Sequence, residues 1–244
     1  MITPYDWQES VNRREEFVRL RLRDGSPVVA ASCAEGVLIM SVRRRSPKIY
    51  EIYDKLVYGA LGAQSDVEAL RIAAIDFAHQ EGFARSPDDV TIQRVVGVAL
   101  SPAVKRAFGD PTISPLVARG LFAEVADQLE EDKFFTLGYD GDYAPQKNRA
   151  VVAGDDKAEE AATSRLKHGG TIDEALPSCL LAWGAAKASI ELEEEPTDDQ
   201  AISALKTAIE QGEIEAAILE RRTHRENRFR RIDHETVERH LRTL

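Results

Sequence analysis

The side chains that most often carry catalysis or bind metals are sparse in this sequence and are not grouped. Five histidines occur, and none stands near another histidine or a cysteine at a metal-binding spacing: His79, His168, His224, His234 and His240. His234 and His240 are six residues apart, so on one helix they would occupy different faces, which favours surface positions. The Gly-x-x-x-x-Gly-Lys-Ser/Thr phosphate loop, the Gly-x-Ser-x-Gly elbow and the His-Glu-x-x-His zinc motif do not occur. Local motifs therefore predict no catalytic residue, no metal site and no cofactor.

Charge and composition argue against two classes of partner. The 244 residues include 32 Lys and Arg and 42 Asp and Glu, a formal net charge of −10, whereas phosphate binding needs a basic surface. No segment reaches the roughly 18 apolar residues of a membrane helix, and no signal peptide is visible at Met1–Trp7. The contexts of Cys33 and Cys179 are apolar, which predicts buried free thiols in a reducing compartment. We expect a cytoplasmic protein that binds neither nucleic acid nor membrane.

The elements that must position any site begin with a helix and two hairpins. Residues 9–23 place apolar side chains on one side and several arginines on the other, which predicts a helix, and Asp24-Gly25 follows as a stop signal. Two pairs of short apolar runs then predict hairpins: residues 27–33 with 36–42, and residues 49–53 with 56–61.

Helical and strand patterns then alternate in blocks. Ser65 is the expected N-cap of a helix that ends near Gly82, and Asp88-Asp89 is expected to open a second helix to about Phe108, which Pro102 should kink or split. Further strands are predicted at residues 116–125, 133–139, 149–153, 214–219 and 229–232, with a tight turn at Asp140-Gly141 between the second and third. Further helices are predicted at about 156–168, 172–191, 198–211 and 234–243, the last capped by Asp233.

This order predicts an α+β fold. Strands that come in consecutive blocks form hairpins and antiparallel sheets, whereas a doubly wound parallel sheet needs single strands alternating with helices. Two sheets stacked face to face and flanked by helices, a four-layer αββα sandwich, would bury all of the amphipathic faces. We expect one domain over residues 1–244, with an N-terminal segment and helix at 1–24 and the sandwich at 25–244.

Short motifs occur along the chain in a characteristic order. They are Glu16-Phe17, Asp24-Gly25-Ser26, Val28-Val29-Ala30, Gly36-Val37-Leu38-Ile39, Lys48-Ile49-Tyr50-Glu51-Ile52-Tyr53-Asp54, Leu61-Gly62-Ala63-Gln64-Ser65-Asp66, Phe77-Ala78, Arg94 and Phe229-Arg230-Arg231-Ile232. Their order and spacing resemble the α-type subunits of the proteasome core particle over nearly the whole chain. The short distance from Ser26 to Lys48 is more similar to bacterial than to archaeal members. The resemblance implies the αββα sandwich of the N-terminal nucleophile hydrolases.

The resemblance also implies that the chain is not catalytic. In the β-type relatives, processing frees an N-terminal Thr whose amino group acts as the base, helped by a Lys and an Asp. The matching position here is Ser26, followed by Pro27, and Val42 stands where the family has the Asp. Residues 154–156 replace the helpful Gly-Ser-Gly turn with Gly-Asp-Asp, so only Lys48 matches a supporting group. Peptide-bond chemistry would then lie in a β-type partner.

Lys48 has a different implied role. In α rings the matching Lys lies in a pocket between neighbouring subunits and receives the C-terminal carboxylate of an activator or regulatory ATPase, for which a partly buried ammonium is a suitable partner. Glu16, Gly25 and Gly62 match other positions of this activator-docking pocket. The alternative is that Lys48 pairs with Glu51 or the exposed side of its strand. Gly25 and Gly62 can equally serve as a helix C-cap and a tight turn.

Tyr5-Asp6 resembles the Tyr-Asp near the start of α subunits, whose N-termini form the gate of the ring. The implied function is a non-catalytic homo-oligomeric ring, of seven copies, that gates substrate entry, templates β-ring assembly and docks an AAA+ ATPase or another activator. One alternative is a self-compartmentalising peptidase that uses Ser26 after processing. The other is a stand-alone ring scaffold without a β partner.

Four segments keep open interpretations. The arginines of residues 9–23 form a solvated face or pair with neighbours in a ring, and the acidic run 191–196 is expected to be a solvated loop. The basic stretch 221–231 binds an acidic partner or balances the Glu run at 193–195. The role of residues 196–212, which look longer than their counterpart in bacterial relatives, stays open.

Overall fold

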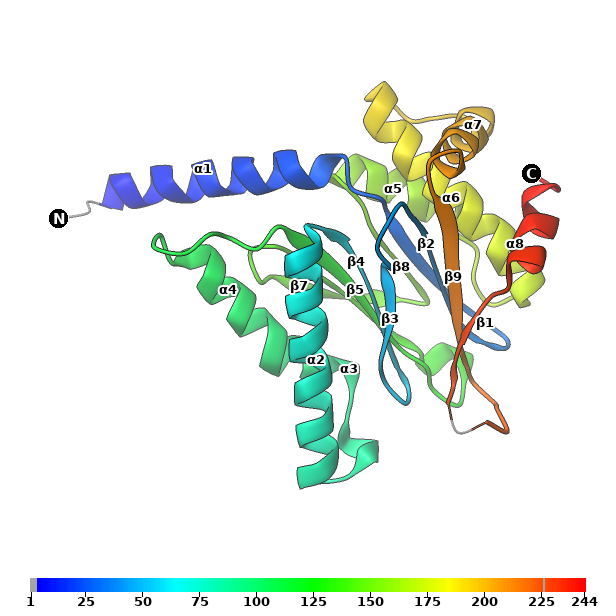
Figure 1. Cartoon of the computed structure of the whole chain (residues 1–244), viewed down its shortest axis with the longest axis horizontal. Helices are drawn as coiled ribbons and strands as arrows, with labels where there is room; N and C mark the ends of the chain where they lie inside the picture. The colour runs from blue at the N-terminus through cyan, green and yellow to red at the C-terminus, as the bar shows by residue number, and fades with distance from the viewer. Residues whose placement is uncertain (1–3, 226) are drawn as a thin grey trace.

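Two five-stranded antiparallel sheets form the centre of the chain (Figure 1). The computed structural model describes residues 4–225 and 227–244, and the side chains from Trp7 onward within these ranges. The first sheet has the order β10-β9-β2-β1-β8, with bounds Phe229–Arg231, Glu213–Glu220, Gly36–Arg43, Val28–Cys33 and Arg149–Val152. The second sheet has the order β3-β4-β5-β6-β7, with bounds Ile49–Tyr53, Leu56–Gly62, Ala118–Glu124, Lys133–Leu137 and Tyr143–Lys147.

Helices cover the outer faces of both sheets, which confirms the predicted αββα sandwich. The first sheet packs against α5 (Asp156–Arg165), α6 (Ile172–Leu192) and α8 (His234–Leu241), and α7 (Asp198–Ile209) packs on α6. The second sheet packs against α2 (Gln64–Ala84) and a helical segment made of α3 (Ile92–Arg94), a π-helical turn (Val95–Leu100) and α4 (Ser101–Gly109). Helix α1 (Pro4–Arg23) lies across one end of the sandwich and projects beyond it (Figure 1).

The apolar strands are buried on both faces, which explains their unbroken Val- and Ala-rich runs. In β1, Val29 and Ala31 face the helix layer, whereas Val28 and Ala30 face the second sheet. The same alternation in β2 places Leu38 in the helix-facing core. Both cysteines are buried and free, as predicted, and burial raises the pKa of the Cys33 thiol to about 11.

Strand β7 was not predicted, and for this reason the tight turn at Asp140-Gly141 was predicted between the wrong two strands. Asp140-Gly141 joins β6 to β7 (Tyr143–Lys147), not to β8. All five residues of β7 are exposed, and Pro145 lies among them. An edge strand of this kind has no buried face, so it lacks the apolar alternation by which strands are recognised.

Several helix boundaries also differ from prediction: α1 begins at Pro4 rather than at residue 9, and α7 ends at Ile209 rather than near 211. Helix α2 begins one residue before Ser65, whose hydroxyl bonds the Asp66 carboxylate rather than capping the helix. The second helix starts after Thr91, whose side chain accepts the Arg94 N–H, while residues 87–89 form a separate 3₁₀ turn. Helix α5 ends at Arg165 instead of about 168.

Pro102 affects its helix by inserting a wider turn rather than by ending it. The N–H of Ser101 donates to the carbonyl of Val96, five residues earlier, just before the proline. Proline has no backbone N–H to donate, and its ring clashes with the preceding turn of an α-helix. The wider π-type turn accommodates both.

His240 is buried, contrary to the predicted surface position. Its Nε2 lies 2.9 Å from the Asp173 carboxylate, so this contact joins α8 to α6. His234, in contrast, is exposed. None of the helices within the described ranges combines the length and apolar character needed to cross a membrane.

The basic stretch 221–231 pairs with carboxylates near its own strands. Arg225 and Arg230 both bond Glu220, at 2.8 and 2.7 Å. No ion pair among the described residues joins this stretch to the Glu run at 193–195, where Glu193 instead bonds Arg23 of α1.

A buried ion pair closes one end of the sandwich. The Arg221 guanidinium makes two bonds to the Asp132 carboxylate, at 2.7 and 2.8 Å, and also donates to the carbonyls of Ala126 and Cys33. Because Cys33 ends β1 and Asp132 precedes β6, this one side chain joins the two sheets.

We expect Asp132→Ala to lower the free energy of unfolding by about 3–5 kcal/mol, because it leaves a buried guanidinium without its counter-ion. Urea denaturation at a fixed protein concentration measures this. Asp88→Ala is the matched control, since Asp88 is exposed and 3.7 Å from Lys55, and it should change the stability little. Equal effects of the two substitutions would contradict a structural role for the buried pair.

Candidate functional site

Between α1 and β1 the backbone passes close to its neighbours at Gly25. Its N–H donates to the carbonyl of Leu22, 2.9 Å away, and ends α1. A Cβ at Gly25 would lie 2.9 Å from that carbonyl and 2.9 Å from Leu61, so the position requires glycine. This supports the helix C-cap interpretation of Gly25 and places Ser26 two residues before β1.

Ser26 is held by backbone groups rather than by a base. Its hydroxyl donates to the carbonyl of Val42 at 2.6 Å and lies 3.3 Å from the hydroxyl of Ser41. Ser41 in turn donates to the carbonyl of Pro27, which also accepts the indole N–H of Trp183. The Val42 side chain, at the position of the family's Asp, is buried and apolar.

A cavity of about 240 Å³ lies beside Ser26 and contains Lys48. Its charged lining is mostly basic, since Arg44, Arg45, Lys48 and Lys187 face one acid, Asp24. The other lining residues are Ser26, Val42, Ser46, Gln64, Trp183 and Ala208. A small basic hollow with an apolar wall can hold a carboxylate.

Lys48 is positioned by a buried carboxylate from β9. The Lys48 N–H donates to Oε2 of Glu215 at 2.8 Å, while Oε1 of Glu215 is buried without a hydrogen-bond partner. Burial lowers the pKa of the Lys48 ammonium, and the charge of Glu215 partly opposes this. Burial likewise raises the pKa of Glu215, and the hydrogen bond from Lys48 N–H opposes that shift.

The pairing of Lys48 with Glu51 is not found. The Glu51 carboxylate accepts a bond from Asn227 at 2.9 Å, and no ion pair in the described part of the chain joins Lys48 to Glu51.

Gly62 occupies a turn that only glycine fits. Its φ is +135°, and a Cβ there would lie 2.1 Å from the carbonyl of Val117. The turn leads from β4 into α2, whose first residue, Gln64, lines the Lys48 cavity. Gly62 and Gly25 therefore shape the chain on two sides of this cavity.

Glu16 lies elsewhere in the single chain. It is exposed on α1 and lines a different, larger hollow of about 1150 Å³ between α1, α4 and the β6–β7 turn, together with Arg19, Lys105 and Tyr139. Tyr5 and Asp6 belong to the first two turns of α1, but their side chains lie outside the described part of the structure.

The unpredicted residues of the Lys48 site that lie farthest away in sequence include Lys187, Trp183 and Glu215. They come from α6 and β9, more than 130 residues after Lys48. The sequence offered one weak signal: Glu215 is the one polar residue of the apolar run 214–219.

The lowered pKa of Lys48 makes stability depend on pH. Below that pKa the ammonium is charged in both the folded and the unfolded chain, so its burial costs free energy. We expect Lys48→Met to be more stable than the wild type at pH 7, by urea denaturation. As pH rises from the lowered pKa toward the ordinary 10.5, the folded chain loses this proton first, so the wild-type penalty disappears and the two curves converge.

Glu215→Gln tests the cause of this pH dependence. Removing the Glu215 charge lowers the Lys48 pKa further, so convergence with the corresponding double variant (Lys48→Met with Glu215→Gln) should start at a lower pH. A difference between wild type and Lys48→Met that does not change up to about pH 10 would contradict the burial of the ammonium.

Comparison with known proteins finds relatives that match most of this chain. It is 32% identical to the proteasome subunit alpha of Actinosynnema mirum over 230 residues, which cover 92% of this chain and 81% of the relative. It is 29% identical to that of Xylanimonas cellulosilytica over 232 residues, 92% and 89% of the two chains. The match to the Jonesia denitrificans protein, also 29% identical, spans 150 residues, 61% of this chain and 63% of the relative. No protein-family model matches the sequence.

The fold and these relatives agree with the resemblance found in the motifs. The similarity to the Actinosynnema protein covers 92% of the chain, which consists mostly of the two sheets and their helices. The chain therefore belongs to the family of proteasome α subunits.

Proposed function

We propose that this chain is a non-catalytic subunit of a proteasome, acting in protein degradation in the cytoplasm. Residues 25–244 would form the sandwich domain that packs into a ring of seven copies, and residues 1–24 its gate segment and helix. The ring would template and cap a β-type ring, which would hold the peptidase sites. The observation that carries the proposal is the basic cavity around Lys48, at the end of the sandwich that α1 covers.

The surroundings of Ser26 support a non-catalytic role. An N-terminal nucleophile needs a free amino group and a hydroxyl that can give its proton to a base. In this chain α1 precedes Ser26, and the hydroxyl donates to the Val42 carbonyl instead. The carboxylate that would orient a catalytic lysine is replaced by the apolar side chain of Val42.

The Lys48 cavity suits the C-terminus of an activator or regulatory ATPase. The ammonium has no carboxylate within ion-pair distance among the described residues, and three further cations line the hollow. A chain-end carboxylate would supply the missing anion, while Trp183 and Ala208 would contact its apolar part. Glu16 faces a separate hollow, so we propose that it joins this site from a neighbouring copy.

Ring formation is the first test. Native mass spectrometry of the full-length protein, alone and with the β-type protein of the same source, should show closed rings that retain the N-terminal segment and capture the β protein. A monomer that ignores the β protein would favour other uses of the fold. A chain that begins at Ser26 would favour the peptidase.

Docking is tested with a peptide from the C-terminus of an activator, by fluorescence anisotropy on the assembled ring. Lys48→Ala should weaken binding by at least about tenfold, the effect of one charge-assisted contact. Lys55→Ala, in the turn between β3 and β4, is the control and should bind as the wild type does. The amidated peptide should lose most of its affinity for the wild type. Equal binding of both peptides would overturn carboxylate docking.

A further inference from the structure

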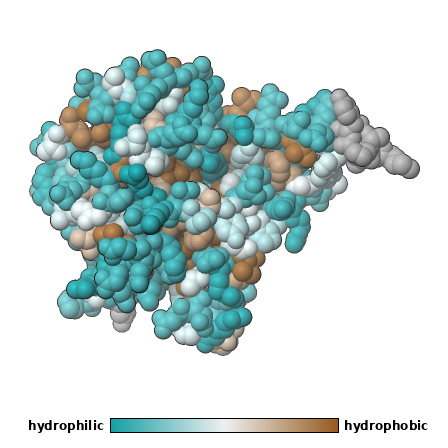
Figure 2. All heavy atoms as spheres, turned by 180° about the vertical axis from the view of Figure 1, so that it is seen from behind, coloured by the Kyte–Doolittle hydropathy of each residue, from teal (hydrophilic) through white to brown (hydrophobic). Residues whose placement is uncertain are grey.

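The N-terminal half of helix α1 has no buried apolar side chain among those described. Among its described side chains only Val18 and Leu22 are buried, and both lie near its C-terminal end. Figure 1 shows the helix extending beyond the sandwich, over α4, with the N-terminus at its free end. Seen from behind in Figure 2, this projecting part is mostly hydrophilic with a few apolar side chains. Polar contacts are therefore the remaining way to hold this half against the domain.

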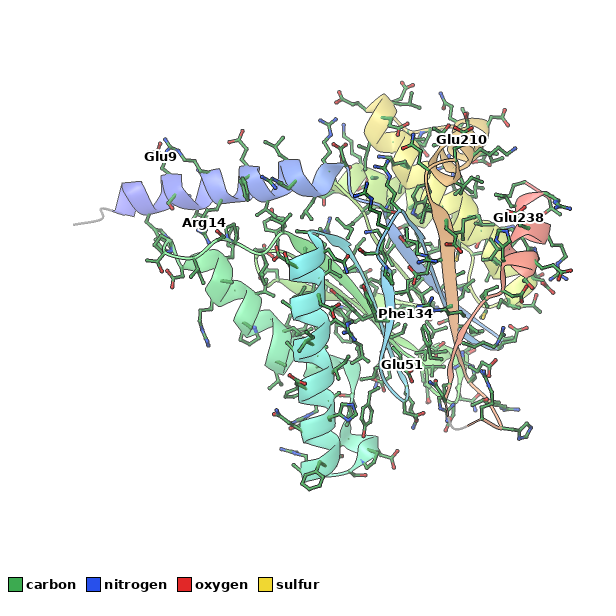
Figure 3. All side chains as sticks on the ribbon, in the orientation of Figure 1. Glu9, Arg14, Glu51, Phe134, Glu210 and Glu238 are labelled. Atoms are coloured by element: carbon green, nitrogen blue, oxygen red, sulfur yellow. The ribbon has the colours of Figure 1, made fainter. Side chains whose placement is uncertain are left out.

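Among the described side chains of this half of α1, Arg14 makes the hydrogen bonds to the body of the domain. Its Nε donates to the carbonyl of Phe108 at 2.9 Å, Nη2 to that of Ala107 at 2.8 Å, and Nη1 to that of Ile113 at 2.9 Å. Figure 3 shows Arg14 on the side of α1 that faces α4, whereas Glu9 points away from it.

All three acceptors lie at one place, the C-terminal end of α4 and the loop that follows. The last carbonyls of a helix have no partner within the helix and carry its negative partial charge. A guanidinium fits them because its donors are fixed in one plane and its charge complements the helix end.

The loop that supplies the third carbonyl is itself held in shape. The Asp110 carboxylate accepts the N–H of Thr112 at 2.8 Å and its hydroxyl at 2.6 Å. This turn directs the chain so that the Ile113 carbonyl meets the guanidinium. The contact surface of Arg14 is thus built by both the helix and its loop.

Arg13, one residue earlier, makes no such contact. Its side chain is 76% exposed and pairs with Glu9 one turn away on the same helix. Arg13 is therefore a surface charge, whereas its neighbour Arg14 connects α1 to α4.

We propose that Arg14 is a positioning residue for the gate: by binding the C-terminal end of α4, it sets the direction in which α1 carries the N-terminal segment. This inference rests on the proposed gating function of residues 1–24. In sequence, the position is one of several arginines on a charged helix. In space, it couples the gate segment to α4, so a partner that shifts the end of α4 would shift the gate segment as well.

Hydrogen–deuterium exchange on the assembled ring measures the attachment directly, without any enzymatic activity. Arg14→Gln should speed exchange of the amides in residues 8–13 by about tenfold, because this half of the helix opens locally once its attachment is lost. Arg13→Gln should change it by less than about twofold. Arg14→Lys keeps the charge at the helix end but offers a single donor atom, so an intermediate effect is expected. Unchanged exchange in Arg14→Gln overturns the proposal.

Hydrolysis of a short fluorogenic peptide by the particle formed with the β-type protein measures the gate. Arg14→Gln should raise the rate by about threefold or more, since a freely moving segment blocks the entrance less, and Arg13→Gln should not. Deletion of residues 2–6 shows whether the segment restricts entry at all. If the deletion leaves the rate unchanged, the gating function itself fails. If the deletion raises the rate and Arg14→Gln does not, only the role of Arg14 is overturned.

Discussion

The central strands are covered on both faces, and this burial constrains where any function can lie. Val28 and Ala30 of β1 contact the second sheet, while Val29 and Ala31 contact the helix layer. A charged side chain pointing from the middle of such a strand would lose its water without gaining a partner. Polar groups and possible sites are therefore confined to the ends of the strands and to the helices that cross them.

The two ends of the sandwich each bury a positively charged side chain, but they differ in how its charge is matched. At the end where β1 finishes, Arg221 is buried and its charge is matched by Asp132 and by backbone carbonyls. At the end where β1 begins, Lys48 is partly buried, and the cavity around it is lined by further cations. The first end stabilises the contact between the sheets. The second keeps a partly buried ammonium that makes no ion pair among the described residues, and burial lowers its pKa.

The relation between Ser26 and Lys48 connects this chain to catalytic members of the same fold. Both residues line one cavity, as a nucleophile and its lysine would. The hydroxyl, however, is bound to the Val42 carbonyl, and α1 continues the chain ahead of Ser26. Ser26 and Lys48 therefore lie beside one another without the free amino group and the carboxylate that would activate a nucleophile.

Much of the fold could be predicted from the sequence because the buried strands and amphipathic helices each carry a periodic pattern. The pairs 27–33 with 36–42 and 49–53 with 56–61, and the final helix capped by Asp233, follow from local residues alone. The motifs around Ser26, Lys48 and Gly62 were enough to indicate the family. By contrast, the exposed edge strand β7 carries no buried face, and a local pattern cannot reveal it.

The tertiary structure alone decided which side chains meet. Glu215 reaches the backbone of Lys48, and Arg14 reaches the end of α4, across separations of 167 and more than 90 residues. His240 is buried because Asp173 of another helix lies beside it. In each case the residue type is ordinary, and its role depends on the groups that folding brings within 3 Å of it. Sequence patterns report burial along one element, whereas charge partners are set by the packing between elements.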